Sequence, residues 1–262
     1  MSYETLTVED DGALRTITLR RPQAANALNL RLAQELFAAA TAADENAGVR
    51  AVIVTGEGRF FCAGGDVRAF HAEGAGLGEY IKRITTFLHG AVSRLHRMDA
   101  PVIMAVNGTA AGGGFSLAIG GDLVLAARSA RFTMGYMRIA MSPDGTSTYF
   151  LPRLVGLRRA QELMLTDRML SAEEAEAWGV VTRVLEDEAL MDEARALGKA
   201  LAAGPTGAYG EAKRLLASSF TTGLETQAEL ETRAIAGRSG TADGREGIAA
   251  FVEKRKASFV GD

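Results

Sequence analysis

The sequence predicts an α/β fold in which strands alternate with helices, followed by a helical C-terminal segment. Three observations predict it. β-rich apolar runs at 51–55, 102–106 and 122–126 have the length and composition of buried strands. Glycine-rich loops and helical patterns separate these runs, and this alternation predicts stacked β-β-α units with parallel strand pairing. From about residue 145 strand patterns nearly disappear and helical patterns replace them.

The elements of the first half follow from turn and periodicity signals. Runs at 5–8 and 14–19 flank Asp10-Asp-Gly12, and this arrangement predicts a hairpin. Helical spacing over 28–43 predicts a helix, which either Asn26 or Asn29 could cap. Further helices are predicted at 77–98, where Ile81, Ile84, Leu88, Val92 and Leu95 share one face, and from Gly113 onward.

The pattern of the second half predicts a series of helices with little sheet. The only strand expected there is 180–184. We therefore predict a β/α core over 1–195 and a helical segment over 196–262. The expected helices cover 145–151, 157–165, 172–178, 188–203, 207–217, 222–238 and 243–256.

Composition narrows the class of protein. A length of 262 residues with 47% hydrophobic and 23% charged residues is ordinary for a globular protein in water. The net charge of −3 disfavours nucleic acid or an anionic membrane as the main partner. Cys62 is the single cysteine, so no internal disulfide can form, and no cluster has metal-ligand spacing. The N-terminus lacks a signal-peptide pattern, so we expect a cytoplasmic protein without a metal.

Two glycine-rich loops are the strongest functional signal. One, 108–116, joins an apolar strand run to a buried helix pattern; the other, 56–66, follows the strand at 51–55. Glycine lets the backbone approach a ligand closely, and a helix start offers free N–H groups. Such a glycine run also serves as a close-packing device. If both loops present amides to one oxygen, they form an oxyanion hole for an acyl group.

These loops, with other motifs, resemble the crotonase (enoyl-CoA hydratase/isomerase) superfamily over nearly the whole chain. The resemblance implies a ClpP/crotonase spiral of β-β-α units. It also implies a C-terminal trimerisation segment that gives a homotrimer or a dimer of trimers. The segments that carry it are Arg21-Pro-Gln-Ala-Ala-Asn-Ala-Leu28, Phe61-Cys-Ala-Gly-Gly-Asp66, Ala105-Val-Asn-Gly108, Gly112-Gly-Gly114, Ser142-Pro-Asp-Gly145, Arg153-Leu-Val-Gly156, Ser171-Ala-Glu-Glu-Ala175, Trp178-Gly-Val-Val181 and Arg245-Glu-Gly-Ile-Ala-Ala-Phe-Val-Glu-Lys-Arg255.

The resemblance implies an acyl-CoA thioester as substrate, with coenzyme A entering as part of that substrate and no permanently bound cofactor. Gly65 and Gly113 match the two amides that hold the thioester oxygen. The resemblance places further substrate-binding positions at Ala25, Ala63, Asp66, Val67, His89, Gly112, Ser116 and Tyr136.

Departures from the family pattern bear on the reaction. The resemblance implies that water-adding members carry two glutamates, where this chain has Ser116 and Tyr136. Neither can act as a carboxylate base. Asp144 remains, although an aspartate between proline and glycine is also a turn or cap residue. A 1,3-proton shift needs a single base, so Asp144 favours double-bond isomerisation over hydration.

Two other functions stay open at this point. His89 and Asp144 match residues of the 4-chlorobenzoyl-CoA dehalogenase branch, in which the aspartate is the nucleophile. A non-catalytic acyl-CoA-binding or RNA-binding member is the other possibility, and the acidic balance disfavours RNA. Asp66 is either a pocket residue or a loop cap. Cys62 reads as a small buried residue.

Overall fold

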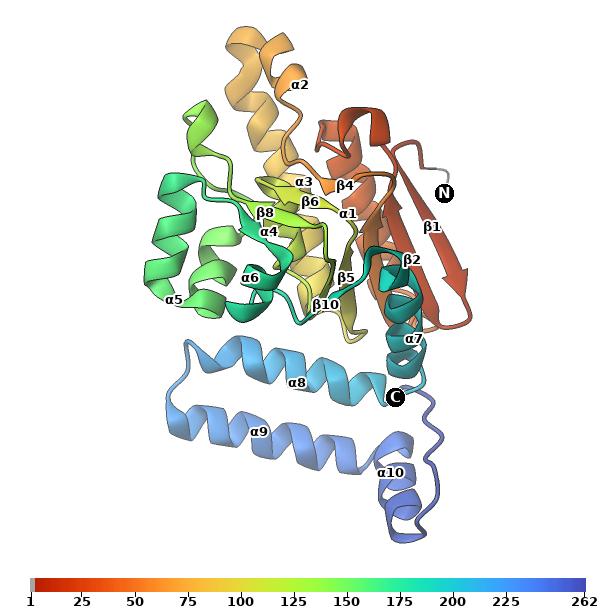
Figure 1. The fold of residues 1–262 in the computed structure, drawn as a ribbon. Helices are drawn as coiled ribbons and strands as arrows, with labels where there is room; N and C mark the ends of the chain where they lie inside the picture. The colour runs from red at the N-terminus through yellow and green to blue at the C-terminus, as the bar shows by residue number, and fades with distance from the viewer. Residues whose placement is uncertain (1–2) are drawn as a thin grey trace.

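The computed structural model describes residues 3–262, which form two sheets with helices around them (Figure 1). The larger sheet has the order β1-β2-β3-β5-β7-β10. β1 and β2 are antiparallel, as the predicted hairpin requires, and every other neighbouring pair is parallel. Its strands are β1 (Leu6–Asp11), β2 (Leu14–Leu19), β3 (Ala51–Gly56), β5 (Val102–Val106), β7 (Leu123–Ala127) and β10 (Arg183–Leu185).

The smaller sheet has the order β4-β6-β8-β9, with β9 antiparallel to β8. Each unit sends its first strand to the larger sheet and its second to the smaller one, so β3-β4, β5-β6 and β7-β8 repeat the same step. A helix follows each step, which confirms the predicted β-β-α units. The strands are β4 (Phe60–Cys62), β6 (Thr109–Ala111), β8 (Arg131–Thr133) and β9 (Leu170–Ser171).

Helices α1 to α7 surround the sheets. α1 and α3 pack against each other, and α7 contacts β2, β3, β5 and β7. Asn29 accepts a hydrogen bond from the Leu32 amide and caps α1, so the structure selects Asn29 over Asn26. The helices are α1 (Leu30–Asp44), α2 (Val67–Ala72), α3 (Leu77–Arg97), α4 (Gly113–Ala118), α5 (Ser147–Thr166), α6 (Ala172–Ala177) and α7 (Leu190–Ala202).

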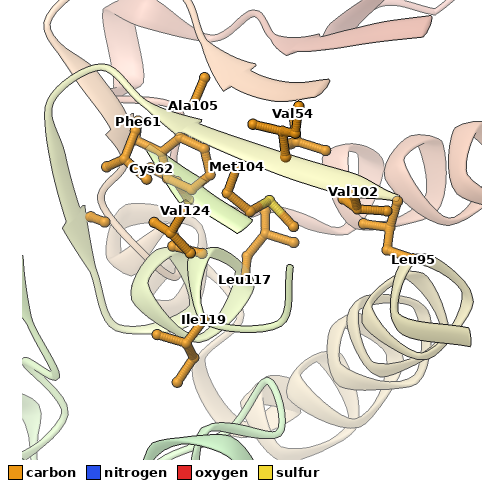
Figure 2. Packing of buried hydrophobic residues seen from close by; sticks show 14 of the residues in the cluster. Val54, Phe61, Cys62, Leu95, Val102, Met104, Ala105, Leu117, Ile119 and Val124 are labelled. Carbon is orange, nitrogen blue, oxygen red and sulfur yellow. The ribbon is translucent and has the colours of Figure 1, made fainter. Parts of the chain in front are cut away.

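The hydrophobic core lies where the sheets and α4 meet (Figure 2). Phe61 and Cys62 of β4, Met104 of β5 and Leu117 of α4 are all fully buried there. α4 has only six residues, and all of them are buried. Burial on every side is what keeps so short a helix in place, because an isolated helix of this length is unstable in water. The core therefore fixes the start of α4, where Gly113 lies.

The C-terminal helices extend away from the sheets as a hairpin and a final helix (Figure 1). They are α8 (Thr206–Ser219), α9 (Leu224–Ser239) and α10 (Ala242–Val252). Lys213 ties α8 to the core, since its ammonium lies 2.7 Å from Asp122 and donates to two main-chain carbonyls. α9 has no buried residue. The division at residue 195/196 stays a prediction, and α7 runs across it.

Most of the smaller sheet was not predicted from the sequence, and one strand prediction was wrong. The run at 180–184 was expected to be the only strand after residue 145, yet β9 also lies there and β10 begins at Arg183. Segments interpreted as loops contain β4 and β6. Strands of two or three residues show no alternating pattern, because their pairing is set by tertiary contacts. The predicted helices 145–151 and 157–165 are one element, α5, interrupted at Gly156 with φ = +77°.

Asn26 holds the N-terminal loop against the segment that precedes β4. Its side chain is fully buried, accepts from the Arg21 amide at 2.8 Å, and donates to the carbonyls of Glu57 and Phe60. We expect Asn26→Ala to lower the free energy of unfolding by at least about 2 kcal/mol, because buried polar partners lose their bonds. Urea unfolding measures this. Asn29→Ala, which removes only a helix cap, should cost about 1 kcal/mol; an equal or smaller loss for Asn26→Ala would contradict this role.

Candidate active site

Two glycine-rich segments cross with no side chain between them. Gly64 has φ = +91° in the first segment, and Gly112 has φ = +50° in the second. A Cβ atom on Gly64 would lie 2.7 Å from the Ala111 carbonyl oxygen and 3.3 Å from the Gly113 nitrogen. Both the backbone angle and the space therefore require glycine at Gly64. The crossing brings the amides of the two segments next to one another.

Gly65 and Gly113 offer amides that the fold leaves free. Gly113 is the first residue of α4, so its N–H has no acceptor within the helix. The Gly65 N–H makes no backbone hydrogen bond among the residues described. Leu28 fixes the residues on either side of Gly65, donating to the Gly64 carbonyl at 2.7 Å and accepting from the Asp66 amide at 2.9 Å. Two such amides can share one developing oxyanion.

Asp144 lies beside this pair of amides. A Cβ atom on Gly113 would be 3.6 Å from Asp144 Oδ1. The Tyr136 hydroxyl donates to Asp144 Oδ1 at 2.5 Å, and Ser116 Oγ lies 3.2 Å from the Tyr136 oxygen. Burial, and then the negative charge of Asp144, raise the pKa of Tyr136 well above its usual value. Tyr136 is therefore a neutral hydrogen-bond donor to Asp144.

The loop that carries Asp144 is held from three sides. Gly145 has φ = +60°, and a Cβ atom there would collide with the Ser116 side chain. The Gly145 amide donates to Nε2 of His89 on α3 at 3.1 Å. This bond requires Nε2 to be unprotonated. The amide and hydroxyl of Ser147 both donate to the Asp144 carbonyl, at 3.1 and 2.8 Å.

Asp66 and Arg21 hold the loop of the first amide. Asp66 caps α2 through the Ala69 amide and lies 2.9 Å from an Arg21 guanidinium nitrogen. Arg21 also donates to the Ala27 carbonyl. Burial by itself would raise the pKa of Asp66, but the hydrogen bonds from Arg21 and the Ala69 amide hold it below its usual value. The cap interpretation of Asp66 thus matches its contacts.

A cavity of about 820 Å³ opens over the crossing. Among the lining residues in the described chain, Asp144 is the only carboxylate. Two cations, Lys82 and Arg138, also line it. Most of the wall is apolar and includes side chains from α2, α3 and the 137–141 segment. These apolar residues include Phe70, Leu77, Ile81, Ile84, Ile139 and Met141.

The structure brings together most of the site residues expected from sequence. Those lining the cavity are Ala63, Gly65, Val67, Gly112, Gly113, Tyr136 and Asp144. Four others, Ala25, Asp66, His89 and Ser116, are not among its lining residues. Each of these four contacts a lining segment instead; Ala25, for example, accepts a hydrogen bond from the Ala63 amide at 3.0 Å.

Cys62 is fully buried beneath the crossing, as expected for a small packing residue. Burial raises the pKa of its thiol to about 12, so the thiol stays protonated near neutral pH. A Cβ atom on Gly114 would collide with the Cys62 carbonyl. Cys62 therefore packs β4 against α4 and has the properties of a structural cysteine.

Sequence reasoning missed several residues of the site. Arg21 carries the bond to Asp66, and its position at the start of the 21–28 motif was the available signal. Lys82, Arg138 and Ser142 line the cavity, but isolated polar residues in a helix or loop give no pattern that sets them apart.

The chain is similar to known proteins over nearly its whole length. The family model for enoyl-CoA hydratase/isomerase matches residues 9–262. A 1,2-epoxyphenylacetyl-CoA isomerase of Escherichia coli strain K12 is 41% identical over 252 residues, covering 94% of each chain. A 4-chlorobenzoyl coenzyme A dehalogenase of an Arthrobacter species is 32% identical, covering 97% of this chain and 92% of the relative.

Solved structures show the same fold. A putative enoyl-CoA hydratase from Streptomyces coelicolor A3(2) superposes with a TM-score of 0.94 at 32% identity, covering 100% of this chain and 96% of that one. Fold and site together define an acyl-CoA-processing enzyme of the crotonase type. The chain belongs to the enoyl-CoA hydratase/isomerase family. The similar proteins carry the names of an isomerase, a dehalogenase and a hydratase, so the particular reaction must be argued from the site.

The lowered pKa of Asp66 makes a prediction about acid stability. Its ionised form stabilises the folded state above the unfolded-state pKa of about 3.9, and this contribution is lost as the pH falls through the lower folded-state pKa. We expect Asp66→Asn to lower the free energy of unfolding at pH 6 and to have a smaller effect at pH 3. Urea titrations at both values measure this. An Asp66→Asn effect that is equal at the two pH values would contradict the ion pair with Arg21.

Proposed function

We propose that the protein isomerises the carbon–carbon double bond of an enoyl-CoA thioester, with Asp144 as the acid/base. One observation carries this proposal: Asp144 is the only carboxylate lining the cavity in the described chain, and it lies beside the Gly113 amide. A 1,3-proton shift needs one base that can accept a proton and return it. Coenzyme A enters as part of the substrate, and no further cofactor is required.

The proposed reaction converts a 3-enoyl-CoA into a 2-enoyl-CoA. The C2–H bond breaks, and its proton moves to Asp144. The electron pair left behind spreads over C2, C4 and the thioester oxygen. The amides of Gly65 and Gly113 donate to that oxygen and stabilise its charge. Asp144 then returns the proton to C4, and the double bond lies between C2 and C3. No electrons are gained or lost overall.

The surroundings of His89 favour this reaction over nucleophilic aromatic chemistry. An aryl-enzyme route would use Asp144 as nucleophile and His89 to activate water. His89 Nε2 already accepts a hydrogen bond from the Gly145 amide, and His89 is not among the residues that line the cavity. The aryl-enzyme route is the alternative, because the Arthrobacter relative is named a dehalogenase. Halide release from a 4-chlorobenzoyl-CoA would support it.

The role of Asp144 is tested with Asp144→Asn. We expect kcat for a 3-enoyl-CoA to fall by about 10²- to 10⁴-fold, since the amide cannot carry the proton. Proton NMR in D₂O follows the conversion, and crotonyl-CoA is assayed in parallel for water addition. Asp192→Asn, the same change at an exposed aspartate of α7, is the matched control and should keep near-normal activity. An Asp144→Asn variant that remains fully active would overturn the proposal.

We also propose that the chain assembles as a homotrimer or a dimer of trimers. The C-terminal helices support this, because large apolar side chains there are exposed, including Leu224, Ile235 and Phe251, the last at 86%. Exposed apolar surface of this extent is typical of a protein interface. We assign this exposed apolar surface to contacts between copies of the chain. None of the described helices is both long and apolar enough to cross a membrane.

Phe251→Asp tests the assembly. We expect the wild-type mass in light scattering to correspond to three or six chains, and the variant to shift toward smaller species because a charge at an apolar interface is costly. Glu253→Lys, a charge change two residues further on, is the control and should keep the wild-type mass. A monomeric wild type would contradict the proposal.

A further inference from the structure

A chain of hydroxyl groups leads from the buried end of the site to Asp144. Ser116 is fully buried and Tyr136 is 8% exposed. The Tyr136 hydroxyl lies 2.5 Å from Asp144 Oδ1 and 3.2 Å from Ser116 Oγ, which in turn lies 3.1 Å from the Gly112 carbonyl. The side chains of Ser116, Tyr136 and Asp144 thus form one connected network beside the second glycine loop.

The number of hydroxyl protons determines which group donates in each hydrogen bond of this network. Tyr136 has one hydroxyl proton, and it donates that proton to the Asp144 carboxylate. Its oxygen can therefore only accept from Ser116. The Ser116 proton is shared between Tyr136 and the Gly112 carbonyl. Both hydroxyls are thus committed within the network, and neither has a proton left to orient a water molecule.

This arrangement makes the two oxygens of Asp144 unequal. Oδ1 accepts from Tyr136, whereas Oδ2 has no hydrogen-bond partner among the residues described. Oδ2 is therefore the oxygen that is left without a partner and is open to a proton from the substrate. A water molecule to be added across a double bond needs two or more polar partners to hold it. The buried hydroxyls of Ser116 and Tyr136 supply no donor for such a water molecule near Asp144.

We propose that Tyr136, supported by Ser116, is a positioning and reaction-specificity residue that keeps Asp144 a one-oxygen proton carrier and so favours proton transfer over water addition. This inference rests on the proposed function. The hydrogen bond from Tyr136 favours the ionised carboxylate, which is the form that must take a proton from C2. Tyr136 acts through Asp144 and has no bond-breaking role of its own.

Other titratable groups surround this network and must be separated from it. His89 on α3 bonds to the Gly145 amide, and Cys62 on β4 lies beneath the crossing. Lys82 and Arg138 line the cavity. Among the residues described, no hydrogen bond joins any of these four side chains to the side chains of Ser116, Tyr136 or Asp144.

The first experiment needs no substrate. Protein labelled with ¹³C at aspartate carboxyl carbons is observed by NMR at a single pH, and Asp144→Asn assigns the signal. We expect Tyr136→Phe to shift the Asp144 carboxyl signal, because the carboxylate loses a hydrogen-bond donor. Ser116→Ala should shift it by less, because Ser116 reaches Asp144 only through Tyr136.

The second experiment measures the choice of reaction. Isomerisation of a 3-enoyl-CoA and hydration of crotonyl-CoA are assayed with wild type and Tyr136→Phe. We expect the ratio of hydration to isomerisation to rise in the variant, since Oδ1 becomes free to hold water. An unchanged ratio in Tyr136→Phe would overturn the inference. If Tyr136→Phe does not fold, Ser116→Ala decides, and an unchanged Asp144 carboxyl signal in that variant would overturn the inference equally.

The two proposals fail in different ways. If Asp144→Asn keeps full isomerase activity, the proposed function is wrong, whatever Tyr136 does. If Asp144→Asn is inactive but Tyr136→Phe leaves the ratio of hydration to isomerisation unchanged, only the role of Tyr136 is wrong.

Discussion

The site depends on one steric constraint, which is the crossing of two backbone segments at Gly64 and Gly112. No side chain fits between them, because even a Cβ atom on Gly64 would lie 2.7 Å from a main-chain oxygen of the other segment. The crossing places the free amides of Gly65 and Gly113 on one side of the cavity. It is held from beneath by Phe61, Cys62 and the buried helix α4 (Figure 2). Packing energy in the core thus maintains a polar geometry that would not form by itself.

Asp144 depends on the same constraint. Its loop closes over α4 because Gly145 leaves room for Ser116, and that contact would be lost with any larger residue. The carboxylate is then fixed by Tyr136, while Ser147 holds the main chain. A single carboxylate in an apolar cavity is a base whose strength its neighbours can set. The nearest of these neighbours is a neutral hydroxyl, which suits proton transfer between two carbons.

Much of the fold could be predicted from sequence because its signals are local. The larger sheet follows from continuous apolar runs, and the cap of α1 from Asn29. The smaller sheet could not be predicted, since strands such as β9, with two residues, carry no pattern. The motif resemblance identified Gly65, Gly113 and Asp144, and the fold brings them to one cavity. Contacts between distant residues, such as Arg21 with Asp66, depend on side-chain geometry that spacing does not encode.

The central claim is that one carboxylate carries the same proton from C2 to C4. A single-turnover experiment in ordinary water with a 3-enoyl-CoA deuterated at C2 tests it most directly. The account predicts that part of the deuterium appears at C4 of the 2-enoyl-CoA product, because one carboxylate takes the deuteron from C2 and delivers it to C4 in a cavity whose wall is mostly apolar. A product with deuterium absent from C4, even in the first turnover, would contradict the direct return of the same proton by Asp144.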